Sequence, residues 1–255
     1  MESIYLIFFF LLGLAMGSFL CVVGLRLGKE EDFIKGRSYC DNCHHELKAL
    51  DLVPIFSYLF LRGRCRYCKK KISPLSFFLE LFTGLLYMIA FYSFGFSLKL
   101  ILVLLAISLT MIIFASDLTY LIIPDEVLIF FGISFFIIEV LQKGLIGGIS
   151  CLANALTLLL IMYAIMLAGN FLFKKESLGG GDVKLLFVIG LVLEPLLGVI
   201  NIFLASLIAL PISLFLYHKN KEHVIPFGPF ILVAFLIILF SKVTTTDVIN
   251  FFYTL

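Results

Sequence analysis

The chain has 255 residues, of which 62% are hydrophobic and 14% are charged, and its formal net charge is +2. Soluble domains carry about 45–50% apolar and about 25% charged residues, so this composition excludes a soluble globular fold, a disordered chain and a secreted disulfide scaffold. The composition predicts a polytopic membrane protein whose partners include the lipid bilayer and no nucleic acid.

Apolar runs long enough to cross a hydrocarbon core about 30 Å thick recur along the chain. The first run covers residues 4–25 and is followed, not preceded, by Arg26, so we interpret it as a membrane span and not as a cleaved leader. Further runs cover about 74–96, 98–115, 125–141, 147–173, 183–193, 196–217 and 227–242. These runs predict an all-α fold of about eight transmembrane helices, in which the short sixth helix could be partly re-entrant.

The same runs divide the chain into three parts: a first transmembrane helix over residues 1–26, a polar insert over 27–73, and a core of seven helices over 74–255. If the N-terminus lies outside the cell, all Lys and Arg residues except Lys99, Lys143 and Lys242 lie on one face of the membrane. Cytosolic connections of membrane proteins are enriched in basic residues. We therefore predict that this face, with the insert, is cytosolic.

Cysteine residues in the insert form two Cys-x2-Cys pairs, which are Cys40 with Cys43 and Cys65 with Cys68. Two such pairs can supply four thiolates to a tetrahedral Zn2+ ion. Disulfides are not expected in the reducing cytosol, so we predict a structural zinc knuckle. Unliganded thiols or redox-active pairs are the alternative, and His44 and His45 are either further candidate ligands or solvated residues beside the knuckle.

Two aspartates lie where apolar runs meet the cytosolic face. Asp117 directly follows the apolar run 101–115, and Asp182 follows three glycines, Gly179, Gly180 and Gly181. Two carboxylates at one depth can form an aspartic-protease-type dyad, in which the ionised group activates water and the protonated group donates to the peptide carbonyl. A helix N-terminus favours negative charge and a C-terminus disfavours it, so we assign the ionised role to Asp182 and the protonated role to Asp117.

Each acidic residue also has a simpler interpretation. Asp182 alone could be a helix N-cap, and Asp117 alone could be a loop residue. Their common face favours the dyad, and the glycines would let an extended peptide approach the backbone closely. Asp125, which follows Pro124, is most simply a helix cap. Glu80 lies inside the second span, where a carboxylate is costly, so it either forms a structural pair or serves the reaction.

These motifs resemble those of the type IV prepilin peptidases, a family of intramembrane aspartyl proteases. The similar segments are residues 17–20, 22–23 and 26 in the first span, 51–54 and 57–59 between the cysteine pairs, Asp117 with 123–125, 179–184, and 226–230. Two positions depart from the family pattern. Cys21 stands where an asparagine is usual, and Leu75-Ser76-Phe77 replaces a customary Arg-Tyr-Pro ahead of Glu80.

The resemblance implies a bifunctional enzyme of the bacterial inner membrane. Asp117 and Asp182 would cleave the short basic leader of type IV prepilins or pseudopilins at the cytosolic face. The enzyme would then methylate the new N-terminal residue with S-adenosylmethionine, an activity that the family associates with the cysteine insert. Gly179, Gly180, Gly181 and Lys184, together with Glu80 and Asp125, are expected to support the substrate or the site.

Two other classes of protein compete with this interpretation. A proton- or ion-coupled transporter could use Asp117 and Asp182 as a relay, but transporter sites usually lie near the midplane of the bilayer, and these aspartates are predicted at one face. A zinc-bearing membrane scaffold without chemistry would leave both aspartates unexplained. The sequence therefore favours the peptidase.

Overall fold

A computed structural model describes residues 2–31, 37–40, 42–174, 178–219 and 225–254, which form helices joined by loops. The chain separates into two compact units. The first contains residues 1–100 and 107–120, and the second contains residues 101–106 and 121–255. The predicted all-helical class is confirmed, since extended pairing within the described ranges consists of two isolated β-bridges in the insert.

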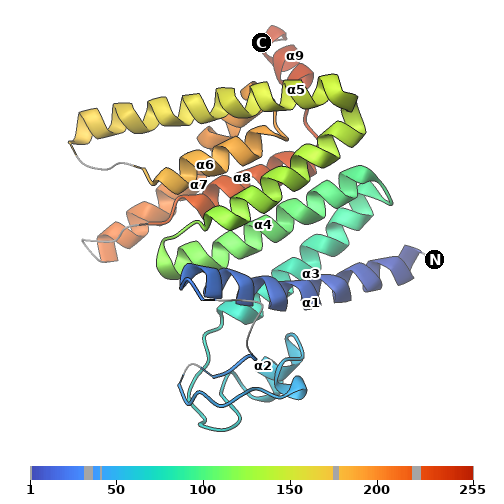
Figure 1. Cartoon of the computed structure of the whole chain (residues 1–255), viewed down its shortest axis with the longest axis vertical. Helices are drawn as coiled ribbons and strands as arrows, with labels where there is room; N and C mark the ends of the chain where they lie inside the picture. The colour runs from blue at the N-terminus through green and yellow to red at the C-terminus, as the bar shows by residue number, and fades with distance from the viewer. Residues whose placement is uncertain (1, 32–36, 41, 175–177, 220–224, 255) are drawn as a thin grey trace. The chain divides into compact units, whose positions relative to one another are not determined.

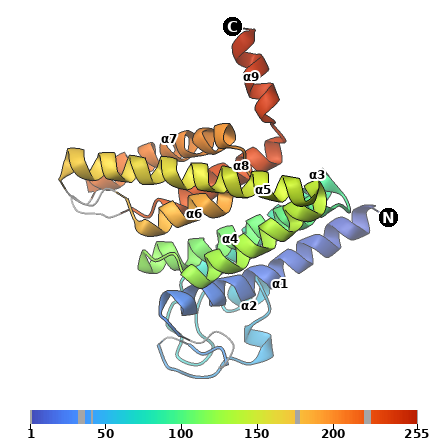
Figure 2. The same ribbon diagram turned by 45° about the horizontal axis from the view of Figure 1, so that its top comes forward.

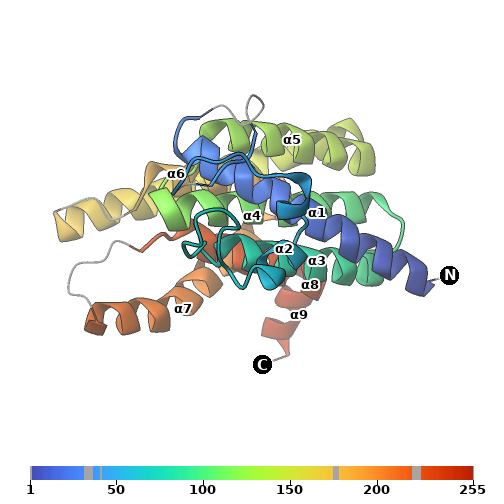
Figure 3. The same cartoon turned by 90° about the horizontal axis from the view of Figure 1, so that it is seen from below.

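The first unit consists of membrane-type helices and the polar insert (Figure 1). Its elements are α1 (Glu2–Gly28), the 3-10 turn Ala49–Asp51, α2 (Phe56–Phe60), α3 (Leu75–Phe94) and most of α4 (Leu98–Tyr120). Figure 3 looks onto the insert, whose chain runs mainly as loops between α1 and α3. Helices α1 and α3 therefore lie at nearly the residues of the first two apolar runs. The division of the chain into a first span, an insert and a seven-helix core stays a prediction.

Helix α1 packs closely against α3 (Figures 1 and 2). A Cβ atom added to Gly13 would lie 2.7 Å from the Cα of Gly84, and one added to Gly17 would lie 2.8 Å from the Cα of Glu80. Small residues four positions apart allow membrane helices to approach in this way. Above the glycines, the rings of Phe9 and Phe91 stack with centroids 4.6 Å apart.

We expect Gly13→Val to weaken this helix pair, because the larger side chain would overlap the backbone of α3. Such overpacking costs about 1–3 kcal/mol or more of unfolding free energy. Ala15→Val is the matched control, because Ala15 lies on the same helix with its side chain exposed. Thermal unfolding of the purified chain in detergent measures the effect. Equal unfolding temperatures for the two variants would contradict the close packing of α1 on α3.

The second unit contains the remaining helices, which are α5 (Asp125–Phe173), α6 (Gly180–Gly190), α7 (Pro195–Lys219), α8 (Gly228–Ser241) and α9 (Thr245–Tyr253). Helix α5 has 49 residues, and at 1.5 Å per residue its length of about 73 Å is more than twice a hydrocarbon core. It is broken at Gly144, whose φ of 74° and ψ of −177° are not helical. The break divides α5 into the two segments that the apolar runs 125–141 and 147–173 predict, and Figure 1 shows the bend between them.

Five helices within the described ranges, α1, α3, α4, α5 and α7, are long and apolar enough to cross a membrane. The count becomes six if α8 and α9, which meet at 81°, form one broken span. Helix α6 has 11 residues, so its length of about 16 Å is too short to cross alone. The structure thus supports a polytopic membrane protein with five or six candidate spans, and eight spans stays a prediction.

Candidate functional site

The four knuckle cysteines form one cluster in the first unit. Their four sulfur atoms all lie within 4.8 Å of one another, and the Sγ atoms of Cys40 and Cys68 are 3.9 Å apart. A tetrahedral Zn2+ with Zn–S bonds of about 2.3 Å holds its sulfurs about 3.8 Å apart, so the cluster has the size that the ion requires. Among the described residues, this is the one group of three or more potential ligands close enough to hold a metal ion.

The two cysteine pairs repeat the same backbone geometry. In the first, Cys40 N donates to the carbonyl of His45, and His44 N donates to the carbonyl of Cys40. In the second, Cys65 N donates to the carbonyl of Lys70, and Lys69 N donates to the carbonyl of Cys65. Each pair thus closes a tight turn that presents two thiols to the centre, as two zinc knuckles would.

The pKa values of the clustered thiols move in opposite directions. The His45 backbone N–H lowers the pKa of the Cys43 thiol, but burial and hydrogen bonds with the other three cysteines outweigh it and raise that pKa to about 11. Backbone N–H groups of Cys68 and Tyr67 directed at the thiol of Cys65 lower the pKa of that thiol to about 7. A lowered pKa increases the fraction of thiolate, which is the form that binds metal. His44 and His45 are exposed and do not belong to the cluster, and the ring of His45 instead lies against Tyr67 with centroids 3.7 Å apart.

Asp51 fixes the loop between the two pairs. Its buried carboxylate accepts hydrogen bonds from Arg66 Nε at 2.6 Å, from the Tyr67 hydroxyl at 3.3 Å and from the Lys48 backbone N–H at 3.1 Å. Burial opposes ionisation, but the Lys48 N–H and the Arg66 guanidinium outweigh it and hold the pKa of Asp51 below its ordinary value. The sequence alone does not predict this pairing of Asp51 with Arg66, because the two residues are 15 positions apart.

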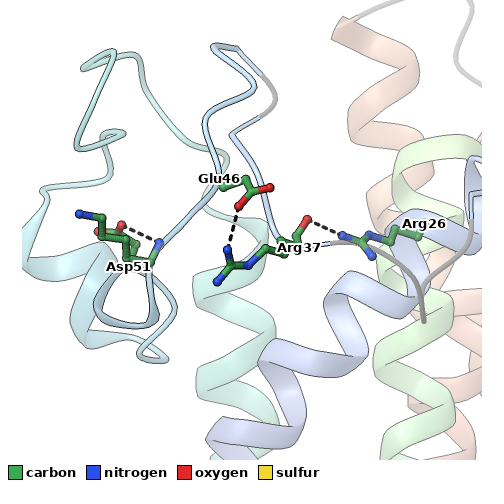
Figure 4. Close-up of polar contacts among 5 residues, drawn as sticks. Arg26, Arg37, Glu46 and Asp51 are labelled. Atoms are coloured by element: carbon green, nitrogen blue, oxygen red, sulfur yellow. Dashed lines mark hydrogen bonds and ion pairs between the residues drawn. The ribbon is translucent and has the colours of Figure 1, made fainter.

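A second set of contacts joins the insert to the end of α1. Arg26 Nη2 donates to the carbonyl of Arg37 at 3.1 Å, and the Arg37 guanidinium forms a 3.0 Å ion pair with Glu46 (Figure 4). The pair is well exposed and contributes at most about 1 kcal/mol. The hydrogen bond from Arg26 is the contact that joins this part of the insert to the last turn of α1.

Glu80, the acid inside the second span, anchors the insert to the membrane helices. Its side chain is buried, and Oε2 accepts a 2.7 Å hydrogen bond from the backbone N–H of Ile55. Glu80 also shares a side-chain hydrogen bond with Ser18 of α1. Ile55 has a φ of 61°, which is a strained conformation for a β-branched residue. Glu80 was expected either to form a structural pair or to serve the reaction, and these contacts support the structural role. Its partner is the backbone amide of Ile55 and not a basic side chain.

We expect Glu80→Ala to release the insert, because it leaves the half-buried Ile55 N–H without its acceptor, at a cost of about 1 kcal/mol. Amide exchange at Ile55, measured by hydrogen–deuterium exchange, should accelerate by about 10-fold or more. Glu80→Gln retains an oxygen acceptor and is expected to preserve most of the protection. Unchanged exchange in Glu80→Ala would show that this bond does not hold the insert.

Asp117 lies in the last turn of α4, within the first unit. Its side chain is 5% exposed, so the acid is buried at the end of a long apolar helix. Because α4 continues to Tyr120, the structure excludes the interpretation of Asp117 as a loop residue. A buried acid at a helix end is a candidate catalytic residue, because burying a carboxyl group lowers the free energy of unfolding.

Asp182 lies in the first turn of α6, within the second unit, and is 7% exposed. Gly179 is the N-cap, and Gly180 and Gly181 are the first two helical residues, so Asp182 is not the N-cap. Its carboxylate points back towards the start of the helix, since Oδ2 lies 3.5 Å from the position of a Cβ added to Gly179. The helix dipole favours negative charge in this turn. The pairing of Asp182 with Asp117, which belongs to the other unit, stays a prediction.

Asp125 and Lys184 meet beside the start of α6. Lys184 Nζ donates to both carboxylate oxygens of Asp125 at 2.8 and 2.7 Å. The expected capping role of Asp125 is wrong, because Pro124 occupies the N-cap position and Asp125 is the first helical residue. Both side chains are more than half exposed, so the pair adds little stability. It ties the first turn of α5 to the helix that carries Asp182.

Comparison with known proteins adds a consistent set of relatives. Residues 11–94 match the bacterial peptidase A24 N-terminal domain, and residues 102–214 match the type IV leader peptidase family. A prepilin leader peptidase/N-methyltransferase of Bacillus subtilis (strain 168) is 35% identical over 72% of this chain and 72% of the relative. Proteins of the same name from Vibrio cholerae serotype O1 and Myxococcus xanthus are 31% and 33% identical, over 94% and 77% of this chain and 98% and 59% of the relatives. No solved structure matches the chain.

Proposed function

The chain belongs to the type IV leader peptidase family, and we propose that it removes the leader from type IV prepilins or pseudopilins and then methylates the new N-terminal residue. The observation that carries this proposal is the similarity to the Vibrio cholerae prepilin leader peptidase/N-methyltransferase, which extends over 98% of that relative. Both predicted functional regions, the cysteine insert and the segment with the two aspartates, lie within the matched family regions.

The peptidase step uses Asp117 and Asp182 as general acid and general base. Ionised Asp182 accepts a proton from water, which adds to the carbonyl carbon of the scissile peptide, while protonated Asp117 donates to the carbonyl oxygen. Collapse of the resulting tetrahedral intermediate breaks the C–N bond. The departing amine receives the proton that Asp182 took from water, and the hydroxyl that becomes the new carbonyl oxygen returns its proton to Asp117. The burial of both acids, each at a helix end, supports this assignment.

The orientation of the substrate follows from the proposed topology. Eight transmembrane segments with the N-terminus outside place both aspartates and the insert at the cytosolic face of the bacterial inner membrane. A prepilin whose basic leader lies in the cytosol and whose apolar helix lies in the bilayer would present its junction at that depth. Residues 179–181 are glycines, so no side chain blocks the approach of a peptide to Asp182 from the start of α6. The ion pair between Lys184 and Asp125 holds α6 beside α5.

The proposed function requires two cofactors, a structural Zn2+ ion and the methyl donor S-adenosylmethionine. Cys40, Cys43, Cys65 and Cys68 would hold a structural Zn2+, which the size of the sulfur cluster supports. S-adenosylmethionine supplies an electrophilic methyl group when it is bound. The chain itself would orient the new N-terminal amine, keep it unprotonated and exclude competing water.

Reconstitution tests the proposal directly. The purified chain in lipid vesicles, mixed with a prepilin and S-adenosylmethionine, should yield pilin that lacks its leader and carries the mass of one added methyl group. Intact-mass spectrometry measures both changes in one sample. A prepilin that keeps its full mass, in vesicles where the chain instead carries protons or ions, would favour the transporter.

A further inference from the structure

Helix α9 of the second unit has nine residues, and none of them is buried. Isolated helices shorter than about 12–15 residues are only marginally stable in water, and most helices are stabilised by packing of an apolar face. The described part of the chain does not bury such a face of α9. The surroundings of the protein must therefore cover it.

The apolar side chains of α9 gather on one side of the helix. Val248, Ile249 and Phe252 follow the i, i+1, i+4 spacing that forms a single helical face. Asp247 and Asn250, which are three residues apart, lie on the opposite side. Ile249 is 42% exposed and Phe252 is 70% exposed, so the apolar face is open. Helices that lie in the boundary between water and a bilayer have this division of polar and apolar faces.

Hydrogen bonds fix the start of α9. Asp247 Oδ2 accepts from the backbone N–H of Thr244 at 2.9 Å and from the Thr244 hydroxyl at 2.6 Å. The Thr245 hydroxyl donates to the carboxylate of Glu194, which immediately precedes α7. These contacts hold α9 at an angle of 81° to α8, and Figure 2 shows α9 turning away from the end of that helix.

The angle between α8 and α9 decides whether the two helices form one span. At 1.5 Å per residue, α8 is about 21 Å long and α9 is about 14 Å long. At 81°, α9 extends only about 2 Å along the axis of α8. That is too little to complete a crossing of about 30 Å. Helix α9 instead runs nearly perpendicular to α8, in the direction of a bilayer surface that α8 approaches end-on.

We propose that α9 is an interfacial anchor, which lies in the plane of the membrane surface with Val248, Ile249 and Phe252 inserted between the lipid headgroups and the acyl chains. The partner of this face is the lipid bilayer itself. Tyr253 follows at the margin of the face and is 86% exposed, and tyrosine is enriched at membrane–water interfaces.

The charge of α9 indicates which property of the bilayer it recognises. Asp247 is the single charged residue of the helix, and its carboxylate is engaged in the cap. Binding therefore depends on insertion of apolar side chains and not on attraction to anionic headgroups. The bond from Thr245 to Glu194 connects the anchor to the turn between α6 and α7, so the anchor also fixes the depth of that turn.

A single introduced tryptophan tests the proposal, because the chain contains none. Phe252→Trp places the fluorophore on the apolar face, and Asn250→Trp is the matched control on the polar face of the same helix. In the purified full chain in phosphatidylcholine vesicles, the emission of Phe252→Trp should be blue-shifted relative to that of the control. Its quenching by aqueous iodide should be several-fold weaker.

Brominated lipids then measure the depth of the same fluorophore. Interfacial helices insert about 5–10 Å into the boundary of headgroups and acyl chains, so lipids brominated near the headgroup should quench Phe252→Trp more strongly than lipids brominated near the chain ends. The blue shift and the quenching should stay the same when anionic lipid is added. A blue shift that requires anionic lipid would overturn insertion by apolar side chains.

The remaining outcomes also decide the matter. Equal iodide quenching of the two variants would place α9 in water, and strongest quenching by bromine near the chain ends would place it inside a span. Protection of Phe252→Trp from both iodide and bromine would show that protein, such as a second copy of the chain, covers the face.

A measurement on the unmodified chain does not depend on the folding of a variant. A lipid with a photoactivatable group near its headgroup should label peptides that contain residues 245–253. Label on other helices with none on these residues would overturn the anchor.

Discussion

Asp117→Asn and Asp182→Asn are each expected to reduce leader cleavage by about 10²–10⁴-fold, the usual contribution of a general acid or base. Asparagine is close in size to aspartate but can neither accept a proton from water nor deliver one to the carbonyl. Both side chains are buried, and a neutral amide costs less to bury than a carboxylate. The variants should therefore insert into the membrane and fold normally while they lose peptidase activity.

The measurement is the initial rate of leader release by purified variants in vesicles, with prepilin below saturation. Glu126→Gln is the matched control, because it removes an exposed acid in the first turn of α5. Its rate should equal that of the unmodified chain. If either aspartate variant cleaves at the control rate, that residue is not part of the catalytic machinery.

The second large effect concerns the metal. Cys40→Ser and Cys65→Ser should lose zinc, because one of four sulfur ligands is replaced by a hydroxyl that ligates poorly. Structural zinc contributes about 10–16 kcal/mol of apparent binding free energy in small zinc-finger peptides. Among the described residues of the insert, few are buried apart from Cys40 and Cys65. Without the ion, the insert is therefore expected to become disordered and sensitive to protease.

Zinc content of the purified chain and limited proteolysis of residues 37–73 check this expectation. The unmodified chain should carry about one zinc, as expected for a four-cysteine site. Cys151→Ala is the control, because this cysteine lies in α5 of the second unit, outside the cluster. Zinc-free protein with an intact, protease-resistant insert would show that the cysteines are not a structural metal site.

Much of the helical fold could be predicted because the signals are local. The long apolar runs give α1, α3, α4 and α7 within a few residues, and the polar stretch around residues 141–147 predicts the break in α5. The break falls at Gly144, where the positive φ suits a residue without a side chain. The two cysteine pairs are equally local, since each closes within one tight turn.

The contacts that attach the insert could not be predicted, because they join residues far apart in the sequence. Glu80 meets Ile55 across 25 residues, and Asp51 meets Arg66 across 15. Hydropathy predicts that a buried acid needs a partner, but it does not say which one. The backbone conformation of Ile55 could not be predicted either, because a positive φ is unusual for a β-branched residue.

A double-mutant cycle tests most directly whether Asp117 and Asp182 act as one dyad. Cleavage rates are measured for the unmodified chain, the two single Asp→Asn variants and the double variant. If the two groups work as a unit, the double variant should be no slower than the slower single variant, since either loss already removes the concerted step. If the two losses multiply in the double variant, the aspartates contribute independently, and the account of a single catalytic dyad is contradicted.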